Sequence, residues 1–569
     1  MSDAVNVRTG ARILVDQLRM QGVNHLFCVP GESFLDVLDA LIDAPGLRLV
    51  VNRHESGSAF MAAGYARLTG QPGVAFVTRG PGACNAAVGV HHARQDSLPL
   101  ILFVGLTPGA FQEREAFQEI DPVQFFGPIA KWAARVDRAE RIPEFVGRAF
   151  QAATTGRPGP VVLGLPEDVI AQSAAAVDAR CHQTIAPAPS DMQIAGLRRL
   201  LGQARRPIAI VGGPGWNAQS CDNLRVFAEA NQLPVATAFR HQDVFDNTHP
   251  NYAGDVGLGI NPALAERIRS ADLVLALGVR LGEATTGGYR LIEAPVPRQR
   301  LVHAHPGIEE LGRVYQADLM INAGMQQLAA RLAMMSPVDT PAWSDALAQA
   351  RADYLAWQAP PDGPAPQLDL RAVLLELAAA LPRDALVCNG AGNYAAWVHR
   401  FFPFRLPGTQ IAPTSGCMGF AVPAAIAAKI AAPERTVVCI TGDGDFLMSS
   451  QELAAAAQCN AGVLFLVCNN GMYGTIRMHQ ERRFPGRVVG TDLTNPDFVQ
   501  LARAYGGFAS RVERSGDFAA ALAAALAALR SSRLPALIEL ACDPAQLLPE
   551  LRLPQSGAPS GREGPAQGG

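Results

Sequence analysis

The chain of 569 residues is long enough for roughly three or four domains of about 150 residues each. A composition that is 49% hydrophobic and 17% charged provides for a large buried core and excludes a globally disordered chain. A formal net charge of −3, without any run of Lys or Arg, argues against a nucleic-acid-binding protein. A small-molecule substrate is therefore the better expectation.

The N-terminal stretch 1–18 is amphipathic and capped, and it does not resemble a secretion signal. No stretch reaches about 18 apolar residues without a charge, so no membrane-spanning helix is expected. The 10 cysteines include no Cys-x-x-Cys pair, which argues against a zinc site or a redox motif. Many lie in apolar runs, such as Cys439, and we interpret the cysteines as small core residues in a reducing compartment. These features predict a soluble, cytoplasmic protein.

Two proline-rich stretches, 186–190 and 359–366, divide the chain, because repeated prolines neither continue a helix nor pair in a central strand. A polar, Gly/Pro-rich stretch at 555–569 lacks apolar anchors and is predicted to be a disordered tail. The expected domains span residues 1–185, 190–355 and 367–550.

Short apolar runs alternate with longer helical patterns in each domain. The runs lie at 74–77, 100–104, 208–211, 273–277, 436–440 and 463–468. Fully apolar strands joined by helices predict parallel sheets covered on both faces. The expected fold class is α/β, with three doubly wound parallel-sheet domains. Ligands bind beyond the carboxyl ends of such strands, so functional residues are expected in the turns that follow them.

In the first domain, Glu55 lies between a strand that ends near Val51 and a small-residue helix that starts near Ser56. Carboxylates are common caps at helix N-termini. Taken alone, this position favours a structural role for Glu55.

In the third domain, strand 436–440 runs into Gly442-Asp443-Gly444, and strand 463–468 ends in Asn469-Asn470-Gly471. A helix is expected between them, over about 450–458. Asp443 and Asn470 would then follow two adjacent strands joined by one right-handed crossover. Because adjacent strands are about 5 Å apart, both side chains can reach one ion.

The residue types at this edge suit a magnesium ion and a diphosphate. Mg²⁺ prefers oxygen ligands and keeps phosphate oxygens in its shell. Gly442 and Gly444 let the backbone approach a phosphate closely. The alternative is a pair of turns that merely end strands, but their separation by one helix and one strand favours the metal site.

The pattern Gly442-Asp443-Gly444, 24 residues and then Asn469-Asn470 resembles the fingerprint of thiamine-diphosphate-dependent enzymes. The resemblance implies that Asp443, Asn470 and the backbone carbonyl of Met472 hold the metal. No dinucleotide-binding Gly-x-Gly-x-x-Gly motif follows these strands, which argues against a nicotinamide enzyme.

The run from Arg53 to Arg67 is similar to the pyrimidine-binding domain of the acetolactate synthase group. The resemblance implies that Glu55 hydrogen-bonds the aminopyrimidine ring of the cofactor and so promotes removal of the thiazolium C2 proton. The pyrimidine and diphosphate sites of that family belong to different subunits. A homodimer with the cofactor at its interface, or a homotetramer built from such dimers, is therefore implied.

Two further segments resemble cofactor-binding parts of the family. In the stretch 414–420, Met418 would wedge between the two rings of the cofactor and the carbonyl of Gly416 would accept a bond from its amino group. An ordinary core methionine is the alternative. The loop 389–394 resembles the second diphosphate-contacting loop, with Gly390, Gly392 and Asn393 as contacts, although a plain turn fits it nearly as well.

The segments 78–85 and 116–119 resemble the lining of the active-site channel, and Gln118 is a candidate for orienting the substrate. His91 and His92 lie nearby. Adjacent histidines cannot share one helix face, so a structural role is favoured for both.

The sequence departs from acetolactate synthases at two places. A flavin-associated Arg-Phe-Asp-Asp-Arg run is replaced by the stretch 280–286, which leaves FAD binding uncertain, although Gly212–Gly215 could accept a nucleotide or form a tight turn. A tryptophan that helps to select the acceptor is replaced by His479. With Arg477 and Arg482 it could receive an anionic substrate, but a solvated helix face is slightly favoured.

The resemblance favours a decarboxylase–carboligase, a transferase acting on 2-oxo acids. The alternative is a lyase of 2-hydroxy ketones or 2-hydroxyacyl-CoA, similar to benzaldehyde lyase, and a pyruvate-oxidase-like reaction would require flavin. A binding or regulatory protein that retains the fold without catalysis is a further possibility. The presence of Glu55, Asp443 and Asn470 argues against it.

Overall fold

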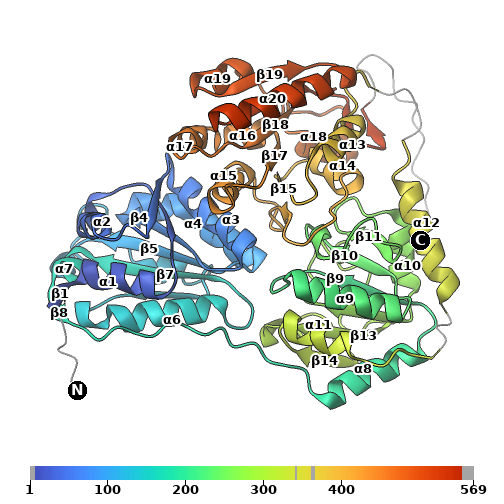
Figure 1. Cartoon of the computed structure of the whole chain (residues 1–569), viewed down its shortest axis with the longest axis horizontal. Helices are drawn as coiled ribbons and strands as arrows, with labels where there is room; N and C mark the ends of the chain where they lie inside the picture. Colours follow the sequence, from blue (N-terminus) through green and yellow to red (C-terminus); the bar gives the residue numbers. More distant parts are fainter. Residues whose placement is uncertain (1–6, 340–342, 361–365, 554–569) are drawn as a thin grey trace.

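The computed structural model describes residues 7–339, 343–360 and 366–553, which form three α/β domains (Figure 1). Each domain contains a six-stranded sheet in which every pairing is parallel, with helices on both faces. The predicted fold class is therefore confirmed. The stretches 361–365 and 555–569, which include part of one predicted linker and the predicted tail, lie outside the described residues.

The first domain has the strand order β3-β2-β4-β5-β7-β6. The strands are β2 (His25–Cys28), β3 (Arg48–Val51), β4 (Gly73–Thr78), β5 (Leu100–Leu106), β6 (Trp132–Arg135) and β7 (Pro160–Pro166). The main helices are α1 (Gly10–Met20), α2 (Leu35–Ile42), α3 (Glu55–Thr69), α4 (Arg79–Asp96), α5 (Pro122–Phe126), α6 (Ile142–Thr154) and α7 (Glu167–Ala171). A short antiparallel pair, β1 (Val7–Thr9) with β8 (Ser173–Ala175), closes one end.

The third domain repeats this topology in the order β16-β15-β17-β18-β20-β19. Its strands are β15 (Leu386–Asn389), β16 (Gln410–Ile411), β17 (Val437–Gly442), β18 (Leu464–Asn469), β19 (Phe508–Val512) and β20 (Ala536–Ala541). Its helices are α13 (Leu370–Ala380), α14 (Tyr394–Phe401), α15 (Ala421–Ala431), α16 (Asp443–Leu447), α17 (Leu453–Gln458), α18 (Gly474–Arg483), α19 (Phe498–Ala504) and α20 (Phe518–Ser532). In both domains the strand of the sheet that comes first in the chain (β2 or β15) lies between the second and the third (β3 and β4, or β16 and β17), so the strand order reverses beside it.

The central domain has a different order, β11-β10-β9-β12-β13-β14, which is the doubly wound order of many nucleotide-binding domains. Its strands are β9 (Pro207–Val211), β10 (Val235–Ala238), β11 (Tyr252–Val256), β12 (Leu273–Leu277), β13 (Arg300–His305) and β14 (Leu319–Asn322). The helices α8 (Asp191–Gln203), α9 (Ala218–Ala230), α10 (Pro262–Ser270) and α11 (Met325–Ala333) cover it, and α12 (Ser344–Trp357) follows.

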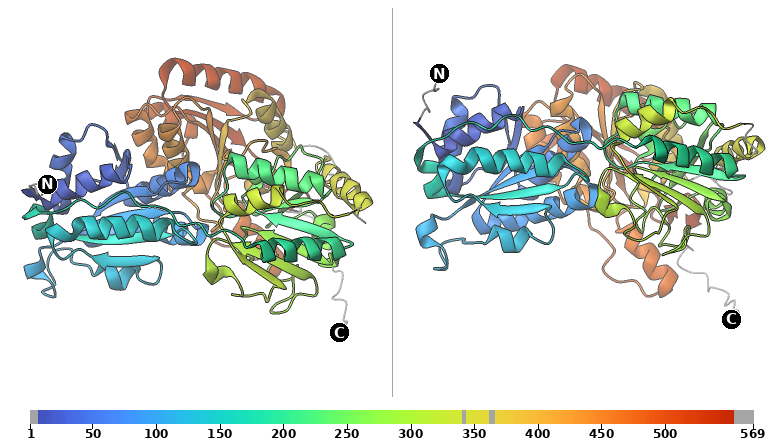
Figure 2. Two further views of the ribbon diagram at one scale, coloured as in Figure 1. Left: turned by 60° about the horizontal axis from the view of Figure 1, so that its bottom comes forward. Right: turned by 90° about the horizontal axis from the view of Figure 1, so that it is seen from below.

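The first and third domains share one hydrophobic core, in which α3 packs directly against α15 (Figure 1). The contact is close because a Cβ atom on Gly64 would lie 2.6 Å from the Cα atom of Ala424. Both further views show the first and the central domain on opposite sides, with the third domain extending between them (Figure 2).

The six predicted apolar runs all coincide with observed strands, although the two in the third domain begin one residue before β17 and β18. The predicted helix over 450–458 is a 3₁₀ turn at Ser450–Glu452 followed by α17. The stretch after Gly442, predicted to be only a turn, is the short helix α16.

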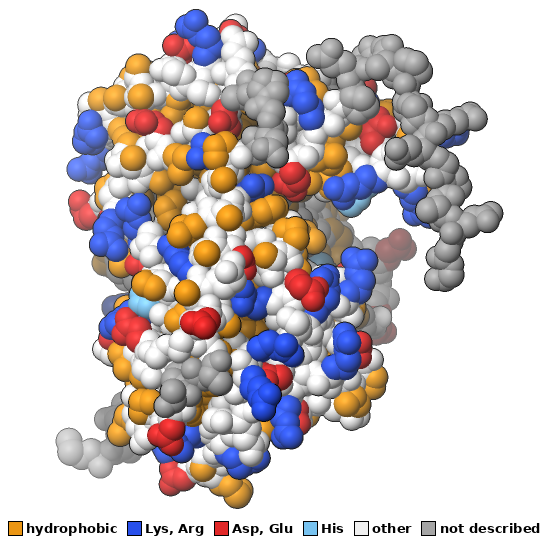
Figure 3. Space-filling model, turned by 90° about the vertical axis from the view of Figure 1, so that its right-hand side faces the viewer, with side chains coloured by type: hydrophobic (Ala, Val, Ile, Leu, Met, Phe, Trp, Pro, Cys, Tyr) orange, Lys and Arg blue, Asp and Glu red, His pale blue; other side chains and the backbone are white. Residues whose placement is uncertain are grey.

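The cysteine prediction holds for the buried members, but Cys84 and Cys181 are exposed and are not core residues. Among the described residues, no helix combines the length and the apolar character needed to cross a membrane. On the face that Figure 3 shows, side chains of both charges are interspersed with hydrophobic ones.

Candidate active site

The carboxyl ends of β17 and β18 bring Asp443 and the turn that contains Asn470 together. The two strands are in register up to Gly442 opposite Cys468. The buried Asp443 carboxylate accepts hydrogen bonds from the backbone N–H of Gly444 (2.9 Å) and that of Gly471 (2.8 Å). Burial raises the pKa of Asp443, and these bonds oppose the rise.

Three oxygen donors of the predicted metal site come from this edge. They are the Asp443 carboxylate, Oδ1 of Asn470, which accepts from Met472 N at 3.3 Å, and the Met472 carbonyl, which accepts from Gly474 N at 2.9 Å. Nowhere in the described chain do three or more His, Cys, Asp or Glu side chains group closely enough to hold a metal. One carboxylate with amide and carbonyl oxygens suits Mg²⁺ that also binds phosphate.

Asn495 also belongs to this site, although no sequence pattern identified it. Its Nδ2 donates to Oδ2 of Asp443 at 2.7 Å and to Oδ1 of Asn469 at 2.9 Å. Its Oδ1 is buried and has no partner within residues 7–339, 343–360 and 366–553. Asn495 precedes Pro496, a dipeptide that indicates only a turn, so its position opposite Asp443 depends on tertiary structure.

The loop 389–394 surrounds Tyr394. A Cβ atom on Gly390 would lie 2.4 Å from the Tyr394 hydroxyl, and one on Gly392 would lie 2.6 Å from its ring. Both glycines are therefore required by this packing. Asn393 accepts a bond from Thr475 Oγ1 at 2.8 Å. Its Nδ2 is buried, has no partner in the part of the chain that the structure describes, and remains a donor for an anionic ligand.

Asp445, which the sequence analysis did not single out, connects this loop to the turn before α15. Its buried carboxylate accepts from the N–H of Ala391 (2.8 Å), the hydroxyl of Tyr394 (2.6 Å) and the N–H of Gly419 (2.5 Å). Burial raises the pKa of Asp445. One side chain thus fixes two predicted cofactor-binding segments relative to Asp443.

The turn 416–419 contains two glycines with positive φ, Gly416 at 69° and Gly419 at 80°. Ser449 Oγ donates to the carbonyl of Gly419 at 2.7 Å. Met418 is half-buried and belongs to none of the hydrophobic clusters, so it is not an ordinary core methionine.

Glu55 is the first residue of α3, and its Oε2 accepts from Asn85 Nδ2 at 2.9 Å. The cap of this helix is His54, whose ring nitrogen accepts from the N–H of Ser56 at 3.1 Å. Glu55 is therefore not needed as the cap. Its carboxylate also lies near Gly82, where a Cβ atom would be 3.6 Å from Oε1.

Glu452, a second residue that the sequence did not reveal, comes from the third domain and holds the start of α3. Its buried carboxylate accepts from Asn52 Nδ2 (2.9 Å), Arg53 N (3.1 Å) and His54 N (3.1 Å). A Cβ atom on Gly57 would lie 2.3 Å from Oε1. The only sequence signal was a Gln-Glu pair before an alanine-rich helix, which is ordinary.

Gln118 lies on the same edge of the first domain as Glu55. Its backbone has a φ of 62°, its carbonyl accepts from the N–H of Gly80 at 2.9 Å, and its side chain is exposed. The segment 78–85, predicted to line the channel, forms the end of β4 and the first turns of α4, which begins at Arg79.

The nearby His92 is buried, as a structural residue would be. It is hydrogen-bonded to Ser415 Oγ at 2.9 Å, its ring centroid lies 4.2 Å from that of Phe420 with the two rings tilted by 39°, and burial lowers its pKa. His91 points to solvent.

The charged helix α18 has the solvated face that the sequence analysis favoured. Arg477 forms an ion pair with Glu481 at 3.1 Å, and both His479 and Arg482 are exposed.

The stretch 212–215 of the central domain forms a tight turn at the point where the strand order reverses. A Cβ atom on Gly213 would lie 1.9 Å from the carbonyl oxygen of Gly278, and Trp216 Nε1 donates to the carbonyl of Gly212 at 2.8 Å. The two loops that end β9 and β12 therefore contact each other directly.

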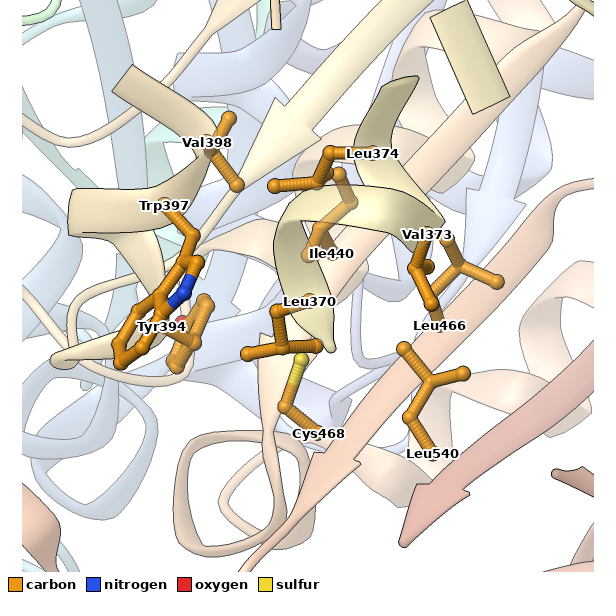
Figure 4. Close-up of a pocket in the computed structure, with 10 residues that line it drawn as sticks. All are labelled: Leu370, Val373, Leu374, Tyr394, Trp397, Val398, Ile440, Leu466, Cys468 and Leu540. Carbon is orange, nitrogen blue, oxygen red and sulfur yellow. The ribbon is translucent and has the colours of Figure 1, made fainter. Parts of the chain in front are cut away.

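One enclosed cavity of the third domain is not a ligand site. It lies between α13, α14 and the sheet, has a volume of about 10 Å³ and is lined by apolar side chains such as Leu370, Leu374 and Leu466 (Figure 4). A space of this size is a packing void.

Known proteins share the three-domain organisation of this chain. The sequence matches the thiamine pyrophosphate enzyme N-terminal TPP binding domain at residues 8–125, the central domain at 194–332 and the C-terminal TPP binding domain at 390–540. It is 32% identical to the acetolactate synthase large subunit of Corynebacterium glutamicum, over 90% of this chain and 83% of the relative.

Two other relatives show the same level of similarity. The acetolactate synthase isozyme 2 large subunit of Escherichia coli is 31% identical, over 90% of this chain and 92% of its own. The probable acetolactate synthase large subunit of Methanocaldococcus jannaschii is 31% identical, over 95% and 93%. The chain therefore belongs to the thiamine pyrophosphate enzyme family and, within it, resembles the acetolactate synthase large subunits.

Proposed function

We propose that this chain uses thiamine diphosphate and Mg²⁺ to decarboxylate a 2-oxo acid and to join the remaining acyl unit to a second carbonyl compound. Carbon dioxide leaves, and one proton is taken up by the oxygen of the acceptor carbonyl. The observation that carries the proposal is the pairing of Asp443 with the Asn470 turn at one sheet edge. Relatives named acetolactate synthase at this level of identity support the reaction type.

The cofactor would be held by its diphosphate in the third domain. Asp443, Asn470 and the Met472 carbonyl would bind the metal, and the backbone at Gly442 and Gly444 would approach the phosphates. Nδ2 of Asn393, for which the described chain provides no acceptor, supports this assignment, because a buried amide donor without an acceptor suits an anionic ligand. The neighbouring Gly390 and Gly392 leave room for Tyr394, and their backbone N–H groups would contact the diphosphate.

The chain's own residues would orient and protonate groups around the cofactor. When bound, thiamine diphosphate supplies a nucleophilic carbon and accepts the electron pair released with carbon dioxide. Glu55 would share a proton with the pyrimidine ring, with Asn85 orienting its carboxylate. Met418 and the Gly416 carbonyl would hold the cofactor bent, and Gln118 would orient the substrate.

The active form would be a homodimer, alone or paired into a homotetramer, with the cofactor between Glu55 of one subunit and Asp443 of its partner. The free cysteines favour a reducing, cytoplasmic compartment. None of the proposed steps is a net oxidation, so the reaction itself transfers no electrons to a flavin, and FAD binding is a separate question. Mass spectrometry of small molecules released from the purified protein tests for thiamine diphosphate and flavin together.

The test of the reaction is incubation of the protein with thiamine diphosphate, Mg²⁺ and either pyruvate or benzoin. Carbon dioxide release from pyruvate is the expected result. Aldehyde release from benzoin alone would favour the lyase, an alternative supported by His479 in place of the acceptor-selecting tryptophan. No cofactor-dependent turnover of any 2-oxo acid or acyloin would indicate a binding protein.

A further inference from the structure

A cavity of about 350 Å³ lies in the first domain, beyond the carboxyl ends of β4, β5 and β7. Its size is in the range of small-molecule sites. The residue that follows each of these strands, Arg79, Thr107 and Glu167, contributes to its wall. The loop after β5 also lines the cavity, with Phe111, Arg114 and Phe117.

The shared topology of the first and third domains gives this cavity a counterpart. Arg79 follows the third strand of its sheet, as Asp443 does in the third domain, and Thr107 follows the fourth strand, as Asn470 does. The cavity thus occupies the position in the first domain that corresponds to the proposed metal and phosphate site in the third domain. A guanidinium stands where a carboxylate would bind a cation, and a guanidinium binds an anion directly.

The conformation and the contacts of Arg79 suit such a role. Its φ of 32° is unusual for a residue other than glycine, and such backbone conformations cluster at functional sites. Its guanidinium pairs with Glu167, lies 5.8 Å from the ring of Phe117 and has a buried Nε without a partner among the described residues. With Arg114 the lining carries two positive charges against one carboxylate.

The two phenylalanines indicate what accompanies the anion. Phe111 is 51% exposed and Phe117 is 71% exposed, so both rings are free to cover an apolar ligand. The cavity also adjoins the proposed reaction centre. Arg79 is one helical turn from Gly82, which lies beside the Glu55 carboxylate, and Gln118 directly follows Phe117.

We propose that this cavity binds the acceptor substrate, a carbonyl compound that carries a carboxylate on an apolar chain or ring. Arg79 anchors the carboxylate, and Phe111 and Phe117 contact the apolar part. The anchored group is not the carboxylate that leaves, because a salt bridge made before carbon dioxide loss would stabilise the ground state and slow the reaction. That the ligand is the reacting acceptor rests on the proposed function.

The test uses two probes that cannot react, 3-phenylpropionate and 3-phenylpropanol, titrated calorimetrically onto the full-length protein loaded with thiamine diphosphate and Mg²⁺. We expect the acid to bind and the alcohol to bind at least about tenfold more weakly. Arg79→Gln should abolish this preference. Glu167→Gln should strengthen binding of the acid, because it removes the carboxylate that competes for Arg79.

The matched control is Arg148→Gln, since Arg148 also lies over an aromatic ring, that of Trp132, but outside the cavity. It should change neither affinity. Equal affinities for the two probes, or weaker acid binding in both Arg79→Gln and Glu167→Gln, would show that the ion pair is only structural. If Arg79→Gln does not fold, the direction of the Glu167→Gln effect decides.

A failure of the cavity proposal can be distinguished from a failure of the proposed function. Acid-selective binding without turnover of any 2-oxo acid would remove the proposed function and leave the anion site. Turnover of pyruvate without acid-selective binding would overturn the cavity proposal alone.

Discussion

At the scale of single residues, Asp443 has two roles. Its carboxylate accepts a hydrogen bond from Gly471 N, and it faces the proposed metal site. Asp443→Asn keeps the shape of the side chain but removes the charge that a cation requires. We expect the affinity for thiamine diphosphate in the presence of Mg²⁺ to fall by roughly tenfold to a hundredfold or more, measured by calorimetry. Asp492→Asn, at a position 82% exposed beside the same turn, is the control. Equal affinity in both variants would exclude Asp443 as a ligand.

A different effect is expected at Glu55, because this residue would promote proton transfer at the cofactor and would contribute little to cofactor affinity. In Glu55→Gln, the amide oxygen still accepts from Asn85, so cofactor affinity should change little. Exchange of the C2 proton for deuterium, followed by NMR after acid quenching, should slow by roughly a hundredfold. An unchanged exchange rate would remove Glu55 from this role.

Glu452 illustrates why part of the site was not predictable. Motif spacing along the chain identified Asp443 and Asn470, because both follow strands of one crossover unit. Glu452 bonds to residues about 400 positions away, and Asn495 reaches Asp443 from a separate loop. Their polar groups are in no local pattern, since tertiary packing alone brings them to their partners.

At the scale of elements, the strands were predictable because they are buried on both faces and therefore apolar throughout. The short helix α16 was not, because the glycine at position 444 suggests a turn and not a helix. A glycine is needed at this position because a Cβ atom would lie 2.5 Å from the Tyr473 ring. No local sequence pattern indicates this contact. Local propensity was overridden there by packing at the site.

The crossing of α3 and α15 supplies a prediction at this scale. Gly64→Val would place side-chain atoms against the backbone at Ala424, where even a Cβ atom would be 2.6 Å from Cα. Because α3 carries Glu55 at its start, both the helix pair and the site depend on this contact. We expect a loss of about 2 kcal/mol or more in the free energy of unfolding, measured by urea titration. Gly46→Ala, into open space, should be neutral, and a tolerated Gly64→Val would contradict the close packing.

At the scale of the whole molecule, a buried ion cluster joins the first and central domains. Glu310 accepts from Arg157 of the first domain at 2.6 Å and lies within 3.4 Å of Arg280. Burial alone would raise the pKa of Glu310, but the surrounding arginines, Arg313 included, outweigh it and the net pKa is lowered. The sequence predicted the two domains and not this contact between them.

This cluster should make the domain contact sensitive to acid. Because the pKa of Glu310 is lower in the folded state, its contribution is fully present above its unfolded-state pKa and is lost as the pH falls through the folded value. Glu310→Gln should cost about 3–5 kcal/mol at neutral pH, since it leaves Arg157 buried without a countercharge. Thermal unfolding from pH 7 to pH 3 should show this difference shrinking, and a constant difference would argue against the charge as its origin.

The proposed dimer predicts that two inactive variants restore activity when their chains are mixed. If the cofactor lies between Glu55 of one subunit and Asp443 of its partner, chains carrying Glu55→Gln and chains carrying Asp443→Asn should be nearly inactive when pure. Mixed dimers of the two variants would contain one site with both defects and one site with neither. After denaturation and random reassociation, activity should return to about a quarter of the wild-type value per subunit. If instead each site is built within one chain, every site in the mixture carries one defect and no activity returns. The experiment therefore distinguishes a site between subunits from a site within one.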